Sequence, residues 1–281
     1  MVKNFFKVAL RNMLKQKFFS FINVIGLSIG IAASLFVVLY VVDELSYDQF
    51  HADIDKMYRI DLTGRLNGQE ISTTNSCPPI GASMVAEIPE IASAVRIDDI
   101  SDVVVTVDEK SFIEESGLFY ADSNFFEFFD FPLLEGDAKS LLNEPNSVVL
   151  TRDMATKYFG NQEAVGQQLV LFNSKTVYEV TGVAEQPPSN SHFHFTMLLT
   201  TVGVDRFNSP VWFNNSYQTY VKGFQVVDIP IVNSKVRDLT LKHAGPQLEQ
   251  VMGTTFEQFE AQGNAYGYTC LLYTSDAADD L

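Results

Sequence analysis

The fold of this chain is decided by one apolar stretch, FFSFINVIGLSIGIAASLFVVLYVV, which occupies Phe18–Val42 of the 281 residues. It contains no Asp, Glu, Lys or Arg. As an α-helix it would extend about 37 Å, against a bilayer hydrocarbon core of about 30 Å. The stretch therefore predicts a transmembrane helix over residues 18–42.

The charges on the two sides of this stretch differ in sign. Asp43, Glu44 and Asp48 follow it, whereas residues 1–17 hold no acid. The basic residues before it are Lys3, Lys7, Arg11, Lys15 and Lys17. By the positive-inside rule we expect a cytoplasmic N-terminus and a main domain outside. A cleaved signal peptide competes, but the apolar run continues past the small residues at 32–34, so a retained anchor is favoured.

The spacing of the basic residues carries further information. They recur at every fourth position from Lys3 to Lys15, while apolar residues such as Phe6 and Leu10 fall on another side of the same helix. This pattern indicates an amphipathic helix over residues 1–17 in the plane of the cytoplasmic membrane surface, in contact with lipid. Charges that only set the topology explain the sign but not the spacing, and both interpretations stay open.

Small residues line one side of the predicted transmembrane helix. Gly26 and Gly30 form a GxxxG pattern, with Ala33 and Ser34 one turn further on. Small side chains let a second helix approach closely, which favours a packed helix over a solitary tether. Because glycine is common in such helices, the pattern alone is a weak signal.

The composition of the whole chain is that of a folded acidic protein. Hydrophobic residues make up 46% of the sequence, which excludes a disordered chain. The net charge of −16 argues against nucleic-acid binding, because neutralising phosphates requires a surplus of Lys and Arg. We therefore expect no nucleic-acid partner.

Residues 43–269 show alternating strand-like and helical segments, which predicts an α+β fold: a mixed α/β extracytoplasmic domain with a mainly antiparallel sheet. We expect strands at Tyr58–Leu62, Val103–Val107, Ser147–Leu150, Gln168–Phe172, Tyr178–Val183 and Thr196–Thr200. We expect helices at Pro78–Glu87, at Arg152–Phe159 between Thr151 and Gly160, and at Leu239–Gln262 with breaks near Gly245 and Gly253. Five phenylalanines between Phe125 and Phe131 predict a short helical turn that drives aromatic rings into the core.

The residues that carry chemistry are few. His192 and His194 would lie on one face of a strand and suit a metal, but a third ligand, Asp205 or His243, would have to fold back. We therefore interpret His192 and His194 as structural or surface histidines. For Cys77 we expect a buried position as a small apolar residue. The acidic pairs at 98–99 and 114–115 read as solvated surface. We therefore expect no enzyme, no cofactor and no metal.

Several sequence blocks occur in one order over residues 1–268. They are LRN at 10–12, INVIGLSIGIA at 22–32, DELSYDQFH at 43–51, MYRI at 57–60, CPPIGASMVAEIPEI at 77–91, FFEFFDFPLLEGD at 125–137, PNSVVLT at 145–151, KYFG at 157–160, VTGV at 180–183 and PPSNSHF at 187–193. With these blocks the chain resembles the MacB/FtsX-like ABC transporter permeases, as an N-terminal fragment with the first transmembrane helix and a MacB-like periplasmic core domain.

The resemblance implies a permease subunit of the bacterial inner membrane. Such a subunit works as a dimer, with a second permease copy and a pair of cytoplasmic ABC ATPases. It does not hydrolyse ATP itself, but couples the hydrolysis to movements of the periplasmic domain for export or efflux. A periplasmic adaptor or a lipoprotein is a further partner of such proteins. The family's stalk would begin at Asp43, Glu44, Ser46, Tyr47 and Asp48, which otherwise read as polar residues at a helix exit.

The chain departs from the family pattern at its end. The later membrane helices of the family do not follow, so we expect the domain over 43–269 to be incomplete. The string CLLYTSDAADD at 270–280 resembles the translation of a sequencing adapter, which predicts that 270–281 is not native. Two alternatives stay open: a single-anchor extracytoplasmic sensor domain of a signalling receptor, and a tethered hydrolase that uses His192 and His194.

Overall fold

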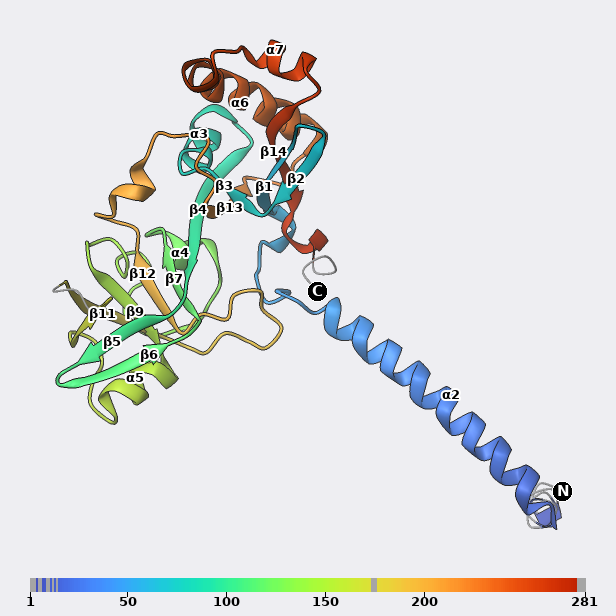
Figure 1. The fold of residues 1–281 in the computed structure, drawn as a ribbon. Helices are drawn as coiled ribbons and strands as arrows, with labels where there is room; N and C mark the ends of the chain where they lie inside the picture. The colour runs from blue at the N-terminus through green and yellow to red at the C-terminus, as the bar shows by residue number, and fades with distance from the viewer. Residues whose placement is uncertain are drawn as a thin grey trace. The chain divides into compact units, whose positions relative to one another are not determined.

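A computed structural model describes residues 4, 7, 8, 11, 13, 15–172 and 176–276. The chain divides into two compact units, Met1–Tyr47 and Asp48–Leu281. The first unit contains one long helix, and the second is a mixed domain of strands and helices (Figure 1).

The long helix α2 spans Lys17–Glu44 and contains the apolar stretch. None of its residues is buried within the protein. Among the described residues, α2 is the one helix long and apolar enough to cross a membrane. In water such an apolar surface would be unfavourable, whereas in a bilayer it meets lipid of the same polarity.

The strands of the second unit form one sheet. In chain order they are β1 (Met57–Leu66), β2 (Gln69–Thr73), β3 (Asn75–Ser76), β4 (Ile91–Ile100), β5 (Val103–Val107), β6 (Lys110–Glu114), β7 (Leu118–Ala121), β8 (Leu133–Glu135), β9 (Ser147–Thr151), β10 (Gln168–Leu171), β11 (Val177–Ala184), β12 (Met197–Thr200), β13 (Tyr217–Gly223) and β14 (Ala265–Leu272). The spatial order is β14-β1-β13-β4-β7-β12-β9-β11-β10-β5-β6, with β2, β3 and β8 attached at its sides. Parallel pairing joins β9 to β11 and β7 to β12, and the other pairs given by the described residues are antiparallel. The predicted α+β class with a mainly antiparallel sheet is confirmed.

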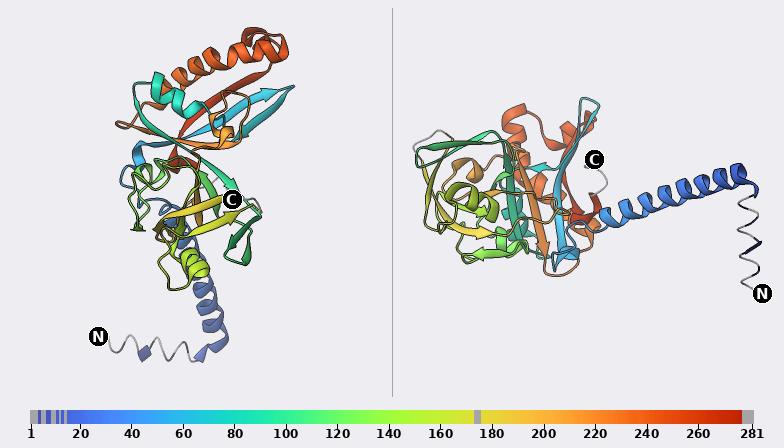
Figure 2. Two further views of the ribbon diagram at one scale, coloured as in Figure 1. Left: turned by 90° about the vertical axis from the view of Figure 1, so that its left-hand side faces the viewer. Right: turned by 90° about the horizontal axis from the view of Figure 1, so that it is seen from below.

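Helices cover the two ends of this sheet. They are α3 (Ile80–Glu87), α4 (Phe125–Phe128), α5 (Arg152–Phe159), α6 (Ile229–Met252) and α7 (Phe256–Ala261), with short 3-10 turns η1 (Ile54–Lys56), η2 (Asp205–Asn208) and η3 (Tyr273–Asp276). In Figure 1 and in the left view of Figure 2, α6 and α7 lie at one end of the domain and α5 at the other. The helix α6 packs on β14 and on α3.

The hydrophobic core has three clusters. One lies between the β1–β14 end of the sheet and the helices α3, α6 and α7, and includes Tyr58, Met84 and Leu248. A second gathers the phenylalanine-rich segment around α4, and a third fills the end around β9–β11 and α5. The rings of Phe125 and Phe129 are 1% and 0% exposed, so the predicted aromatic core is confirmed.

Several predicted elements coincide with the observed ones. The strand β5 and the helix α5 have the predicted bounds, and α5 ends at Gly160, whose φ of 65° lies in the left-handed half of backbone space. The prediction for the last helix was wrong at its start and at Gly245. The helix α6 begins at Ile229, where the Asp228 side chain accepts a hydrogen bond from the Ile231 N–H.

The predicted break at Gly245 does not occur, because burial overrides local propensity there. The helix α6 continues through Gly245 and Pro246 and buries residues along one face, at 232, 236, 239, 240, 244 and 248. The predicted break near Gly253 is confirmed, since Gly253 adopts the left-handed conformation with a φ of 67°.

Residues expected to be foreign take part in the described sheet. Cys270 and Leu272 lie in β14 and pair with Ile60 and Tyr58 of β1. Cys270 is 0% exposed and Tyr273 is 4% exposed. Their origin in a sequencing adapter stays a prediction.

Candidate functional site at the domain entry

The small residues of the predicted helix-packing side lie on the surface of α2. Gly26, Gly30, Ala33 and Ser34 are exposed, and no atom approaches within 4 Å of a Cβ built on either glycine. The Ser34 hydroxyl donates to the Gly30 carbonyl oxygen at 2.9 Å, so its polar group is satisfied within the helix. This side of α2 is therefore free of bulky groups over two turns.

The basic residues before α2 are described in part. Lys7, Arg11, Lys15 and Lys17 have exposed side chains on helical residues. Lys3 lies outside the described residues. The assignment of this segment to the cytoplasmic membrane surface stays a prediction.

The predicted stalk entry is divided between the two units. Asp43 and Glu44 form the last turn of α2, and the Ser46 hydroxyl donates to the Asp43 carbonyl oxygen at 2.7 Å. Tyr47 ends the first unit, and Asp48 begins the second. The sequence predicted these residues as one group, but Asp48 has a different environment from the rest.

Asp48 is held inside the domain. It is 0% exposed, and its φ of 53° lies in the left-handed region, which Asp tolerates better than most residues. Its backbone N–H donates to the Asn190 carbonyl oxygen at 2.8 Å. Its carboxylate accepts the His192 backbone N–H at 3.2 Å and is paired with Nδ1 of the His192 ring.

A second attachment follows three residues later. The Asp130 N–H donates to Nδ1 of His51 at 3.0 Å, and the Ala52 N–H donates to the Asp130 carboxylate at 2.8 Å. The ring of Phe50 lies 5.4 Å from that of Phe131, between centroids. We call residues 48–52 the entry segment, because they connect the first unit to the sheet.

The tautomer of His51 follows from its donor. A backbone N–H can only donate, so Nδ1 is the acceptor and Nε2 carries the proton. Nε2 is buried and has no hydrogen-bond partner among the described residues. Burial lowers the pKa of His51, against the carboxylates of Asp48 and Asp130, which raise it. His51 is therefore neutral in the folded domain at pH 7.

The charge of Asp48 is stabilised by its partner. Burial raises the pKa of the carboxyl, but the hydrogen bond and the charge of His192, with smaller contributions from Tyr273 and Ser191, outweigh it, so the pKa of Asp48 lies below its usual value. A buried carboxylate without such partners would carry a large desolvation cost. The Asp48–His192 pair is the feature that sequence reasoning missed, because the two residues are separated by 144 positions.

Two of the three histidines considered as metal ligands are paired with carboxylates, and the third lies on the surface. His192 binds Asp48, His194 has an exposed side chain, and Nε2 of His243 lies 2.6 Å from a carboxylate oxygen of Glu87. Over the described residues, no group of three His, Cys, Asp or Glu side chains could hold a metal ion.

The expectation of solvated acidic pairs was wrong at two positions. Glu114 is 8% exposed, and its carboxylate accepts from Nζ of Lys157 at 2.6 Å and from the Tyr158 hydroxyl at 2.7 Å. Asp98 is paired with Arg206. Partners from distant segments bury these carboxylates, and a local pattern of two adjacent acids does not reveal them.

A further ion pair links separate segments of the domain. The Arg96 guanidinium makes two hydrogen bonds to the Asp122 carboxylate, at 2.8 and 2.9 Å, and donates to the carbonyl oxygens of Pro78 and Phe207. Arg96 therefore ties β4 to the segments before α3 and after β12.

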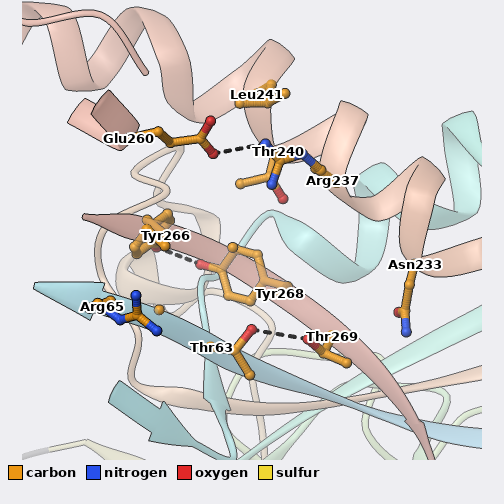
Figure 3. Close-up of a pocket in the computed structure, with 13 residues that line it drawn as sticks. Thr63, Arg65, Asn233, Arg237, Thr240, Leu241, Glu260, Tyr266, Tyr268 and Thr269 are labelled. Atoms are coloured by element: carbon orange, nitrogen blue, oxygen red, sulfur yellow. Dashed lines mark hydrogen bonds and ion pairs between the residues drawn. The ribbon is translucent and has the colours of Figure 1, made fainter. Parts of the chain in front are cut away.

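A cavity of about 440 Å³ lies between α6 and the β1–β14 edge of the sheet (Figure 3). Several of its polar groups are paired with one another. Arg237 lies 2.8 Å from Glu260, the hydroxyls of Thr63 and Thr269 are 3.0 Å apart, and those of Tyr266 and Tyr268 are 2.8 Å apart. Among the described residues that line it, the cavity brings together no nucleophile with a base.

The long apolar helix α2, followed by an α+β domain, fits the class of membrane-anchored proteins with a periplasmic-type domain. A family model described as the MacB-like periplasmic core domain matches residues 20–239. The chain belongs to this family, whose domain is part of ABC transporter permeases. Such permease components generally are not enzymes.

A solved structure shares the fold, and two more distant ones are also similar to the chain. A domain from Porphyromonas gingivalis, described as part of a permease protein, has a TM-score of 0.66 at 20% identity, over 80% of this chain and 92% of that chain. The periplasmic region of MacB from Actinobacillus actinomycetemcomitans has a TM-score of 0.49 at 17% identity, over 67% and 85%. The extracellular domain of the ABC-type transporter YknZ from Gram-positive bacteria has a TM-score of 0.46 at 14% identity, over 76% and 99%. No curated protein matches the chain.

Proposed function

We propose that this chain is part of a permease subunit that couples ATP hydrolysis by a partner ATPase to movements of its periplasmic domain, for export or efflux. The single observation that supports this most is the family match over residues 20–239, which runs through most of α2 into the domain. Along the chain, residues 45–47 are all that separates α2 from the domain, which gives a short covalent path from the membrane to the sheet.

The proposal includes an orientation. The N-terminal basic segment lies at the cytoplasmic face of the bacterial inner membrane, and residues from 48 onward lie in the periplasm or outside the cell. The charge asymmetry supports this, because Lys and Arg flank the N-terminal end of α2 and Asp43 and Glu44 lie at its other end.

The proposed partners are a cytoplasmic ABC ATPase and a second permease copy, with a periplasmic adaptor or a lipoprotein as a further partner. To test the first, the complete protein that contains this chain is isolated in mild detergent from its native membrane. We expect it to carry an ABC ATPase in fixed ratio, and a signalling kinase in its place would contradict the proposal. Extending the reading frame past Thr269 in the source genome separates a permease from a sensor: further apolar spans of about 20 residues support the permease, and a cytoplasmic transmitter would favour a sensor.

The exposed small residues of α2 provide a test within the membrane. Leu at position 30 would fill the face on which a neighbouring helix packs. We expect Gly30→Leu to reduce assembly of the complete permease, measured by cross-linking in membranes, whereas Leu39→Ala outside this face serves as the control. Equal cross-linking of Gly30→Leu and the wild type would contradict the assignment of Gly26, Gly30, Ala33 and Ser34 to helix packing.

A further inference from the structure

The entry segment is attached to the domain more firmly than a linker requires. Within residues 48–52, the Asp48 N–H, the Asp48 carboxylate and the Ala52 N–H each have a hydrogen-bond partner elsewhere in the domain. Flexible linkers instead leave their polar groups to water and absorb displacement by changing backbone conformation. The entry segment lacks this freedom.

The attachment points belong to two loops, one of which leads into the middle of the sheet and the other to the side strand β8. Asn190 and His192 precede β12, and Phe193 and Phe195 of the same loop are buried in the aromatic cluster. Asp130 follows α4, and its neighbour Phe129 also contributes to that cluster. β12 pairs with both β7 and β9, so the loop at 190–195 leads to a central strand.

The ring contacts join the two attachments. The centroid of the His51 ring lies 5.4 Å from that of Phe129 and 5.3 Å from that of Phe131. Phe129 in turn lies 5.1 Å from Phe193. A displacement of the entry segment would therefore press on packed rings rather than on solvent, and close-packed interiors transmit such strain.

We propose that the Asp48–His192 pair, with the Asn190 contact, is the fixed joint through which movement of the membrane helix enters the periplasmic domain. His51 and Phe50 pass this movement to the aromatic cluster and β12. This inference rests on the proposed function and adds the residues that perform the coupling. Asp48 and His192 are positioning residues, since neither touches nucleotide or cargo in this account.

Two variants of the chain test the joint: one changes the Asp48–His192 pair, and the other changes the chain that leads into it. Asp48→Asn keeps an oxygen acceptor and the tolerance for the left-handed conformation but removes the charge that pairs with His192. Insertion of two glycines between Tyr47 and Asp48 leaves the pair intact and adds up to about 7 Å of slack before it. The matched controls are Glu87→Gln, which alters the more exposed histidine–carboxylate pair Glu87–His243, and the same insertion at the Asn67–Gly68 turn between β1 and β2.

The experiment uses the complete transporter with its ATPase in lipid nanodiscs. The readouts are ATPase binding, ATP hydrolysis and the ATP-dependent change in amide exchange of the periplasmic domain. We expect the wild type and both controls to show the change. Asp48→Asn and the Tyr47 insertion should keep ATPase binding and hydrolysis. The ATP-dependent change in amide exchange should be smaller in both by about fivefold or more, which is the lower end of usual coupling between sites.

The outcomes separate this inference from the proposed function. If the insertion at Tyr47 responds to ATP as the wild type does, the joint is refuted, while the permease function stands. The insertion keeps this test valid even where Asp48→Asn unfolds the domain. If the wild type neither binds an ATPase nor changes with ATP, the proposed function and this inference are both overturned.

Discussion

Two histidine–carboxylate pairs lie in different regions of the domain and differ mainly in burial. Asp48 of the Asp48–His192 pair has no exposed side-chain surface, and His192 has 22%. In the pair between α3 and α6, Glu87 and His243 each have 32% exposed. The same type of ion pair therefore fixes a chain segment inside the domain in one region, whereas in the other it lies on the surface between two helices.

This difference in burial indicates which of the two pairs contributes more to the stability of the fold. An exposed pair exchanges one set of partners for water at little cost, whereas removal of one member of a buried pair leaves the other uncompensated. We therefore expect the entry segment to respond strongly to substitution and the α3–α6 face to respond weakly.

The largest effect is expected for Asp48→Ala. The substitution leaves the His192 N–H and ring without their buried acceptor and places Ala in the left-handed conformation. We expect the free energy of unfolding to fall by about 3 kcal/mol, as for other broken buried pairs. Urea unfolding of the detergent-solubilised chain measures this, and a loss as small as that of Glu87→Gln would break the comparison.

A pair of intermediate exposure should give an intermediate effect. The side chains of Arg96 and Asp122 are 19% and 18% exposed. Arg96→Lys keeps the charge but cannot reach the carboxylate and the carbonyl oxygens of Pro78 and Phe207 together. We expect a loss of about 2 kcal/mol in the same unfolding measurement. An unchanged midpoint would show that the additional bonds to the carbonyls contribute nothing.

The entry segment should also be sensitive to mild acid. Because burial lowers the pKa of His51 in the folded domain, the unfolded chain binds a proton more readily. Stability is therefore complete above the ordinary histidine pKa of about 6.5 and falls as the pH drops below it. Protonation of Nδ1 would also displace the Asp130 N–H.

The measurement is the melting temperature of the chain between pH 7.5 and pH 5.5, with His51→Gln beside the wild type. We expect the decline to be smaller in His51→Gln, which has no titrating ring. Equal declines would assign the pH dependence to other groups. Asp48 adds a separate loss at lower pH, because its pKa is depressed and its stabilisation disappears only as the carboxyl is protonated.

The smallest effect is expected for Glu87→Gln. Its carboxylate is shared between Nζ of Lys242 and Nε2 of His243, both at 2.6 Å, on a solvated surface. Water replaces such contacts readily, and salt screens them. We expect a melting temperature within experimental error of the wild type. A loss comparable to that of Asp48→Ala would contradict the role assigned to burial.

The sequence predicted those parts of the fold whose signals are local. Val103–Val107 alternates buried and half-buried β-branched residues, and Arg152–Phe159 lies between an extended Thr151 and a left-handed Gly160, so both elements have the predicted bounds. β4, in contrast, has the sequence IASAVRIDDI, whose Ala, Ser and Asp residues give no strand signal. Its pairing with β13 and β7 makes it a strand.

The candidate site depended on contacts that no local pattern records. Asp48 was assigned to the stalk entry from its place after the apolar stretch, and His192 was read as structural. Their pairing arises from the folded positions of two segments 144 residues apart. The same holds for Arg96 and Asp122, which are brought together by the pairing of β4 with β7.

The central claim is that α2 lies in the membrane and holds the domain outside the cytoplasm. Single cysteines at Lys7 and at the exposed Glu109, labelled with an impermeant maleimide in spheroplasts, test it most directly. Burial raises the pKa of the Cys77 and Cys270 thiols to about 12, so neither should react. We predict labelling of Glu109→Cys in intact spheroplasts and of Lys7→Cys only after lysis. The reverse pattern, or release of the protein into the soluble fraction, would contradict the account.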